Sequence, residues 1–156
     1  MRAYRICKAR WALTAFSGIG AADYPGRWNL LGEKVVYCAE SRSLGSLEVL
    51  AHVARKRTLS KAKFVVIPVD IPDEIIFHPD RLPKNWDAKP HTSASQKFGS
   101  KLMKTHAAVI FPSVVTRGEF NVVLNPLHPD FSKIKIGKAE KLIFDVRVIS
   151  GTRSAP

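Results

Sequence analysis

The sequence predicts a single α+β domain built on a mainly antiparallel sheet. Its 156 residues suit one domain at about 100 to 200 residues each. Hydrophobic residues make up 46% and charged residues 24% of the chain, as in soluble globular proteins. Strand-like segments outnumber helical ones and do not alternate regularly with them, which argues against a doubly wound parallel sheet. No linker or repeat divides the chain, so residues 1–156 are expected to form one domain.

The first half of the chain predicts a strand followed by a helix. Residues 34–39 (KVVYCA) form a short apolar run rich in valine and tyrosine, which favours a strand. From Leu44 to Ala54 apolar residues recur at steps of three and four, which is typical of an amphipathic helix. Ser43 is expected to cap its start, and the helix is expected to end in the basic run at residues 55–57.

The second half predicts one more helix among several strands. Residues 93–105 contain no proline and carry Phe98 and Leu102 at helical spacing, so a helix is expected there. Pro72 separates two strand-like runs, and the remaining apolar runs are also short and rich in β-branched residues. The expected strands are residues 64–69, 74–77, 107–111, 120–124 and 142–148.

Charge and cysteine content limit the classes of function and location. The chain has 25 Lys and Arg against 13 Asp and Glu, a net charge of +12, so phosphates, nucleic acid or an acidic partner could bind. Two cysteines do not make a disulfide framework. No apolar stretch approaches the roughly 18 residues of a membrane span, and the basic first ten residues lack the apolar core of a secretion signal. A cytoplasmic location without membrane attachment is expected.

Common nucleotide and metal motifs are absent from the sequence. There is no G-x-G-x-x-G, no G-x-x-x-x-G-K-[ST], no H-E-x-x-H and no C-x-x-C. The five histidines are widely scattered, without the spacing of a zinc site. No metal is therefore expected.

Residues 24–29 (YPGRWN) are the first candidate site segment. The Pro-Gly pair shapes a turn that presents Arg27 beside Trp28, and a guanidinium group is well suited to bidentate phosphate binding. The alternative is a surface arginine that covers a half-buried tryptophan.

Glu48 and Ser113 are further candidates, each with a simpler explanation. On the expected helix Glu48 lies beside Leu44 at the edge of the apolar stripe, where a carboxylate is partly shielded; it could equally be a solvated residue paired with His52. Ser113 follows Pro112 at the end of an apolar strand, where residues often line a pocket, or it could form a turn.

The order of these residues resembles the RES domain family, which is named after an arginine, a glutamate and a serine. The resemblance rests on residues 17–52, on the Pro-Ser pair at 112–113 and on residues 121–131 (NVVLNPLHPDF). It covers nearly the whole chain with compatible gaps. The family's site positions match Arg27 in GRWN, Tyr37 in the strand that follows, Glu48 in LEVL and Ser113, and Asn125 joins Arg27, Tyr37 and Ser113 among the expected NAD-binding residues.

The resemblance implies a fold, a reaction and a partner. The fold would be like that of ADP-ribosyltransferases, with two packed, mainly antiparallel sheets and an NAD-binding cleft. The protein would be a bacterial toxin that degrades NAD and is paired with an Xre-like helix-turn-helix antitoxin. It would be an NAD glycohydrolase or NAD phosphorylase, with water and inorganic phosphate both open as acceptors, and it would need no cofactor beyond NAD as its substrate.

Roles for the matched residues follow from this implied reaction. Breaking the nicotinamide–ribose bond passes through an oxocarbenium-like state, which Glu48 would stabilise. Arg27 would hold the pyrophosphate, and Tyr37 would stack near the nicotinamide ring. Ser113 would form a hydrogen bond with the ribose or the ring amide.

Two other classes of function stay open. The same residues could transfer ADP-ribose to a protein side chain. A non-enzymatic alternative is a nucleic-acid-binding module that uses the basic runs at residues 55–63 and 133–141. No helix-turn-helix or stacked-aromatic pattern accompanies these runs, so no direct nucleic acid binding is expected from this chain alone.

Overall fold

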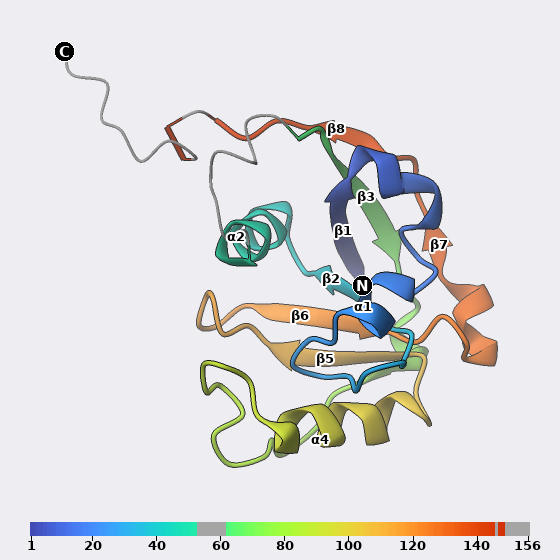
Figure 1. Cartoon of the computed structure of the whole chain (residues 1–156). Coiled ribbons are helices and arrows are strands. Elements are labelled where there is room, and N and C mark those ends of the chain that lie inside the picture. Colours follow the sequence, from blue (N-terminus) through green and yellow to red (C-terminus); the bar gives the residue numbers. More distant parts are fainter. Residues whose placement is uncertain (53–61, 146, 149–156) are drawn as a thin grey trace.

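A single curled sheet forms the centre of the molecule (Figure 1). The computed structural model describes residues 1–52, 62–145 and 147–148. Its eight strands follow the order β4-β5-β6-β2-β1-β3-β7, and β8 pairs with β3 off this path. The strands are β1 (Arg2–Lys8), β2 (Val36–Ala39), β3 (Phe64–Asp70), β4 (Ile76–Phe77), β5 (Ala108–Pro112), β6 (Phe120–Leu124), β7 (Lys135–Ile136) and β8 (Glu140–Leu142).

Two longer helices and several short ones accompany the sheet. None of the described helices is long and apolar enough to cross a membrane. The α-helices are α1 (Ile19–Asp23), α2 (Arg42–His52) and α4 (Ser93–Met103), and the 3-10 helices are η1 (Ala9–Thr14), η2 (Asp73–Ile75) and η3 (Pro129–Lys133).

The pairing of the strands confirms a mixed fold without a doubly wound sheet. Among the described strands only β4 and β5 pair in parallel. The expected two packed sheets are replaced by one continuous sheet in the described part of the chain. The reason is a short antiparallel bridge between β1 and β2 at Tyr4 and Ala39, which links the half that contains β5 and β6 to the half that contains β3.

The strand β1 was not predicted, although it lies inside the sheet. It pairs with β3 along its whole length, from Arg2 opposite Asp70 to Lys8 opposite Phe64. The basic residues in this segment interrupt the apolar pattern by which a strand is recognised in the sequence. The Arg2 guanidinium binds the carboxylate of its cross-strand neighbour at 2.7 Å, and Arg5 donates to the carbonyl of Tyr37 at 3.1 Å. The sheet therefore accommodates Arg2 through an ion pair with Asp70 and Arg5 through a hydrogen bond to a backbone carbonyl.

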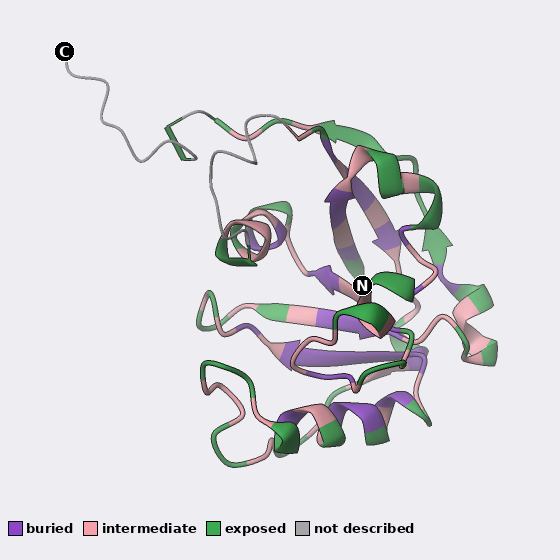
Figure 2. Ribbon diagram, viewed as in Figure 1, coloured by how far each residue is buried: buried purple, intermediate pink, exposed green. Residues whose placement is uncertain are grey.

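The two faces of the sheet bury different clusters. Because successive side chains of a strand alternate between faces, Ile110 and Val122 lie on the inner face, in one core that includes Ala3 and Val69. On the outer face, α2 covers Ile6 and its neighbours, while α4 covers a second cluster on β5 and β6. The central strands are buried and the edge strands β7 and β8 exposed (Figure 2).

Trp28 joins α4 to the outer face of β5. It is only 3% exposed, and its ring stacks on Phe111 with centroids 4.1 Å apart and planes 8° apart. The backbone of Trp28 touches Gly99 in the middle of α4, where an added Cβ atom would clash with the Trp28 carbonyl oxygen. Gly99, which weakens a helix prediction, is thus needed for close packing.

Most predicted elements are present, with shifted ends. The helix α4, the strands β2, β3, β5 and β6 and the described part of α2 confirm the sequence reading. The cap of α2 is Ser41, whose Oγ accepts from the Leu44 amide at 3.0 Å, and not Ser43. Ala54 and residues 55–57 lie outside the described residues.

Two predicted strands were misplaced. Of residues 74–77, only Ile76–Phe77 form a strand, because the preceding residues form η2. The strand expected at residues 142–148 instead spans Glu140–Leu142. It ends there because Leu142 is opposite Phe64, the first residue of β3; residue 146 lies outside the described residues.

Replacing Gly99 with alanine should destabilise the fold. The added methyl group must displace the Trp28 backbone, and overpacking of this kind typically costs about 1 to 3 kcal/mol. The matched control is Gly20→Ala in α1, where a Cβ atom meets nothing within 4 Å. Urea unfolding should show a lower free energy of unfolding for Gly99→Ala alone; equal values for both variants would contradict this packing.

Candidate functional site

Glu48 lies on the side of α2 that faces the end of β5 and β6. The helix is held close to the sheet because Leu44 is fully buried and Gly45 packs against Ile6 and Ala39, where an added Cβ atom would lie only 2.9 Å from Ile6 Cδ1. One turn later the Glu48 side chain is 21% exposed. This agrees with the partial shielding expected from its edge position.

Two side chains, one directly after β5 and one in β6, donate to one oxygen of Glu48. Ser113 Oγ lies 2.9 Å and Asn121 Nδ2 lies 2.6 Å from Glu48 Oε1. Ser113 is 1% exposed, and its Oγ also accepts from the amides of Val115 and Thr116 at 3.0 and 3.1 Å. Ser113 therefore forms a turn and contacts the candidate site at the same time.

The second oxygen of Glu48 is less constrained. Oε2 lies 3.9 Å from Nδ1 of His52, and that nitrogen is closer to the Glu48 carbonyl oxygen, at 2.7 Å. Within residues 1–52 and 62–145, Oε2 accepts no hydrogen bond. Among the described residues, Oε2 is therefore the Glu48 oxygen that is not already hydrogen-bonded.

Arg27 approaches the same region from the loop between α1 and β2. Its Nη1 donates to the carbonyls of Trp86 and Ala88, the latter at 3.0 Å. Burial lowers the pKa of Arg27, and the charges of Asp87 and Glu48 oppose this fall. Since arginine stays charged in proteins, the site combines a cation with the Glu48 carboxylate, and the Nε and Nη2 edge makes no hydrogen bond to the described residues.

Tyr37 anchors the loop that carries Arg27. Its hydroxyl donates to Asn29 Oδ1 at 2.9 Å and accepts from the Trp28 amide at 3.0 Å. Burial raises the pKa of Tyr37, so the phenol stays neutral. A Cβ atom on Gly26 would lie 2.7 Å from the tyrosine oxygen, which explains the glycine before Arg27.

The segment at residues 84–92 is a part of the site that sequence reasoning missed. Gln96 Nε2 links His91 Nε2, at 3.2 Å, to the Gly26 carbonyl, at 3.1 Å. Burial, together with the charges of Arg27 and His52, lowers the pKa of His91. No motif spacing could have indicated these contacts, because they join loops that are distant in sequence.

An ion pair ties residues 84–92 to the turn between β5 and β6. Arg117 Nη2 lies 2.6 Å from Asp87 Oδ2, and its guanidinium lies 5.7 Å from the centroid of the Trp86 ring. In Figure 1 this turn and the segment before α4 lie on the same side of the molecule as α2. The contact places the Ser113 turn beside the segment that binds Arg27.

Asn125 is not brought to this site. It follows β6 at the end opposite to Asn121, and its Nδ2 donates to the Met103 carbonyl at 2.6 Å. Its Oδ1 accepts from the Leu127 amide at 2.9 Å. These bonds join the end of β6 to α4, while Asn121 is the asparagine that contacts Glu48.

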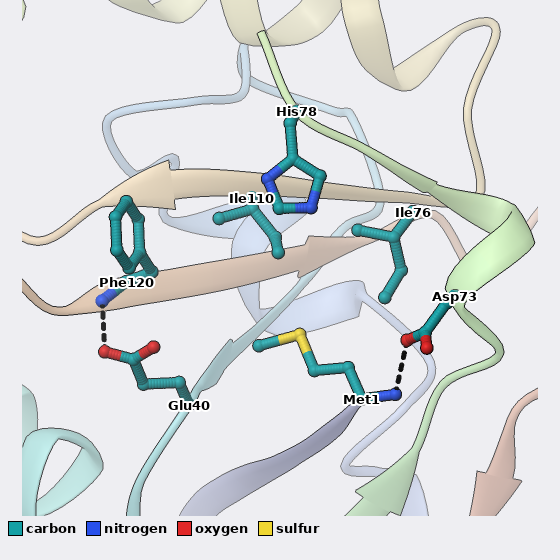
Figure 3. Close-up of a pocket in the computed structure, with 7 residues that line it drawn as sticks. All are labelled: Met1, Glu40, Asp73, Ile76, His78, Ile110 and Phe120. Atoms are coloured by element: carbon teal, nitrogen blue, oxygen red, sulfur yellow. Dashed lines mark hydrogen bonds and ion pairs between the residues drawn. The ribbon is translucent and has the colours of Figure 1, made fainter.

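A pocket of about 390 Å³ lies on the other face of the sheet (Figure 3). Ile110 lines it, whereas the neighbouring Phe111 packs under Trp28 on the outer face. Its carboxylates are already paired: Asp73 with the Met1 amino group at 2.7 Å and Glu40 with the Phe120 amide at 2.8 Å. We therefore place the candidate site at Glu48. The pocket lining is Met1, Glu40, Asp73, Ile76, His78, Ile110 and Phe120.

The described residues form no metal cluster, and they include only one of the two basic runs in full. In the described part of the chain, no three His, Cys, Asp or Glu side chains gather as a metal ion would require. In the run at residues 133–141, Lys133 pairs with Asp130 at 2.8 Å. Most of the run at residues 55–63 lies outside the described residues.

The arrangement suits a substrate that is anionic at one point and develops positive charge at another. A guanidinium edge can bind phosphate oxygens, and a fixed carboxylate stabilises a cation that forms near it. Both groups are partly buried, which strengthens their electrostatic effect.

The chain is similar to one family and to several bacterial proteins. Residues 2–145 match the RES domain family. A protein of Sphingobium sp. (strain YBL2), named Prs ADP-ribosylating toxin, is 37% identical over 140 residues, which cover 85% of this chain and 86% of that protein. Two proteins named Toxin Res are also similar. The one from Photorhabdus laumondii is 35% identical, covering 92% of each chain, and the one from Yersinia enterocolitica is 32% identical, covering 84% of this chain and 88% of its own.

Removing the Tyr37 hydroxyl should loosen the loop that carries Arg27. Tyr37→Phe leaves the Trp28 amide and the Asn29 oxygen without this partner, and an unpaired buried group costs about 1 to 3 kcal/mol. Tyr24→Phe is the matched control, since Tyr24 is 84% exposed. Urea unfolding should show a loss of stability for Tyr37→Phe only; an unchanged unfolding midpoint would show that the hydroxyl does not anchor the loop.

Proposed function

The chain belongs to the RES domain family, and from this we propose that it is an enzymatic toxin that cleaves the bond between nicotinamide and ribose in NAD. The observation that carries the proposal is the geometry of Glu48. One oxygen is held by Ser113 and Asn121, while the other accepts no hydrogen bond from the described residues. The charges of Arg27 and Glu48 are close enough to interact.

The proposed reaction needs few protein groups. Nicotinamide leaves NAD as a neutral molecule, so no strong acid is required, while the ribose develops positive charge as in glycoside hydrolysis. Glu48 would stabilise this charge and orient the ribose hydroxyls or the attacking group. Water and inorganic phosphate are both proposed acceptors, which would make the enzyme a glycohydrolase or a phosphorylase.

The remaining residues are assigned from their contacts. Arg27 would hold the pyrophosphate through its Nε and Nη2 edge, because Nη1 is bound to Trp86 and Ala88. Tyr37 would present its ring near the nicotinamide while its hydroxyl holds the loop. We assign Asn125 to the packing of β6 on α4 and not to NAD binding, since both ends of its amide are hydrogen-bonded there.

We also propose that the fold is of the ADP-ribosyltransferase kind. A curled, mainly antiparallel sheet that encloses a core between its two halves supports this assignment. The site supports it as well, because Glu48 on α2 lies beside the strands β5 and β6, which are joined by one turn.

Transfer of ADP-ribose to a protein is the second candidate, favoured by the relative named Prs ADP-ribosylating toxin. Both reactions begin with release of nicotinamide, so they differ only in the acceptor. NAD labelled in its adenine part distinguishes them. Hydrolysis leaves the label as free ADP-ribose, phosphorolysis leaves it as a phosphorylated product, and transfer leaves it on protein.

The proposed partner is an Xre-like helix-turn-helix antitoxin. The name Toxin Res of two relatives supports an antitoxin, and the net charge of +12 would attract an acidic segment of such a partner. We propose that this segment occupies the phosphate position beside Arg27. NAD and antitoxin would then exclude one another.

This blocking arrangement can be tested by competition. Raising the NAD concentration should displace the antitoxin, and Arg27→Ala should weaken the binding of both, because each charged hydrogen bond lost costs about 1.5 to 3 kcal/mol. Arg10→Ala, on an exposed residue, is the matched control. Calorimetric titration should show the competition; a ternary complex with undiminished NAD affinity would contradict it.

The charge of Glu48 should be essential for NAD cleavage. Glu48→Gln keeps the size of the side chain but removes its negative charge, so release of nicotinamide should fall at least about a hundredfold, as expected for loss of a group that stabilises transition-state charge. Glu74→Gln, on an exposed glutamate, should match the parent. Chromatography of NAD incubated with each protein measures this; equal nicotinamide release by Glu48→Gln would refute the assignment.

A further inference from the structure

We propose that Asn121 is a positioning residue, which together with Ser113 fixes Glu48 so that Oε2 is the oxygen that meets the substrate. This inference rests on the proposed function and deepens it. It assigns Ser113 to holding Glu48 and not to binding the ribose or the ring amide. It also names an asparagine that sequence reasoning did not include among the site residues.

The strand register explains why Asn121 reaches Glu48. Asn121 lies opposite Ala39 in β2 and opposite Phe111 in β5. Ala39 contacts α2 at Gly45, so this point of the sheet lies under the helix that carries Glu48. The side chain of Asn121 therefore points to α2, and its Nδ2 lies 2.6 Å from Glu48 Oε1.

The direction of both hydrogen bonds is determined by their partners. Ser113 Oγ accepts from the amides of Val115 and Thr116, so its one proton is left for Glu48. An ionised carboxylate only accepts hydrogen bonds, so Asn121 must direct its NH₂ group to it. Two donors converge on Oε1 and none of the described residues donates to Oε2.

The two hydrogen bonds from Ser113 and Asn121 to Oε1, here called the clamp, keep the Glu48 carboxylate from pairing with a basic side chain. Glu48 has two basic neighbours. They are His52, whose Nδ1 lies 3.9 Å from Oε2, and Arg27, whose pKa is lowered by burial while the charge of Glu48 opposes this fall. An unclamped carboxylate could rotate to form a bidentate pair with the guanidinium. That pair would remove both the anion that stabilises the ribose cation and the phosphate-binding edge.

Steady-state kinetics with NAD separates positioning from packing. Asn121→Asp has nearly the same shape but cannot donate, so it should lower kcat at least about tenfold, as should Asn121→Ala, because a hydrogen bond to a charged group is lost. KM should change much less than kcat, since the proposed role of Asn121 involves no contact with the substrate.

Ser113→Ala should behave likewise. Ser132→Ala changes an exposed serine that donates to the Pro129 carbonyl, and it should match the parent. Parent-like kcat in Asn121→Asp would overturn the proposal.

A second measurement tests the clamp without turnover. In ¹⁵N-resolved spectra of the whole chain, the side-chain NH₂ resonances of Asn121 should shift when Glu48 is replaced by alanine, because the charged acceptor is lost. Unchanged resonances would overturn the clamp. Failure of the parent protein to cleave NAD would instead overturn the proposed function, and the spectra would still decide whether Asn121 holds Glu48.

Discussion

Glu48 Oε1 receives hydrogen bonds from the end of β5 and from β6 while its own residue lies on α2. This shared oxygen connects α2 to the β5–β6 part of the curled sheet at the point where a ligand would bind. Ser113 also accepts from two amides of its turn, so the turn, the strand and the helix are fixed together. The position of Oε2 follows from these bonds, because the other oxygen cannot leave its donors without unpairing them.

The opposite wall of the site is built by separate contacts. Trp28 is packed between Phe111 and Gly99, and the hydroxyl of Tyr37 binds the two residues that follow Arg27. These contacts hold the backbone of the loop, while the carbonyls at residues 86 and 88 hold the guanidinium. Arg27 and Glu48 thus have independent supports, which the Asp87–Arg117 ion pair connects.

Periodicity was sufficient where a segment has one polar and one buried face. This holds for α2 and α4, and it placed Glu48 correctly at the edge of the apolar stripe. Periodicity was insufficient for β1, because Arg2 and Arg5 interrupt its apolar pattern. Only the structure shows that their side chains are hydrogen-bonded within the sheet. The local sequence suggested Arg27 and Ser113, and the family resemblance added Tyr37 to them. It did not separate Asn121 from Asn125, because only the register of β6 shows which end of that strand lies under α2.

We propose that NAD binds to the outer face of the sheet beside Glu48, and the other assignments depend on this location. It can be tested by a crystal structure of the Glu48→Gln protein with NAD. We expect the nicotinamide ribose next to residue 48 on the side of Oε2, with the pyrophosphate on Arg27. NAD bound instead in the inner-face pocket between Glu40 and His78, with none at residue 48, would refute this location.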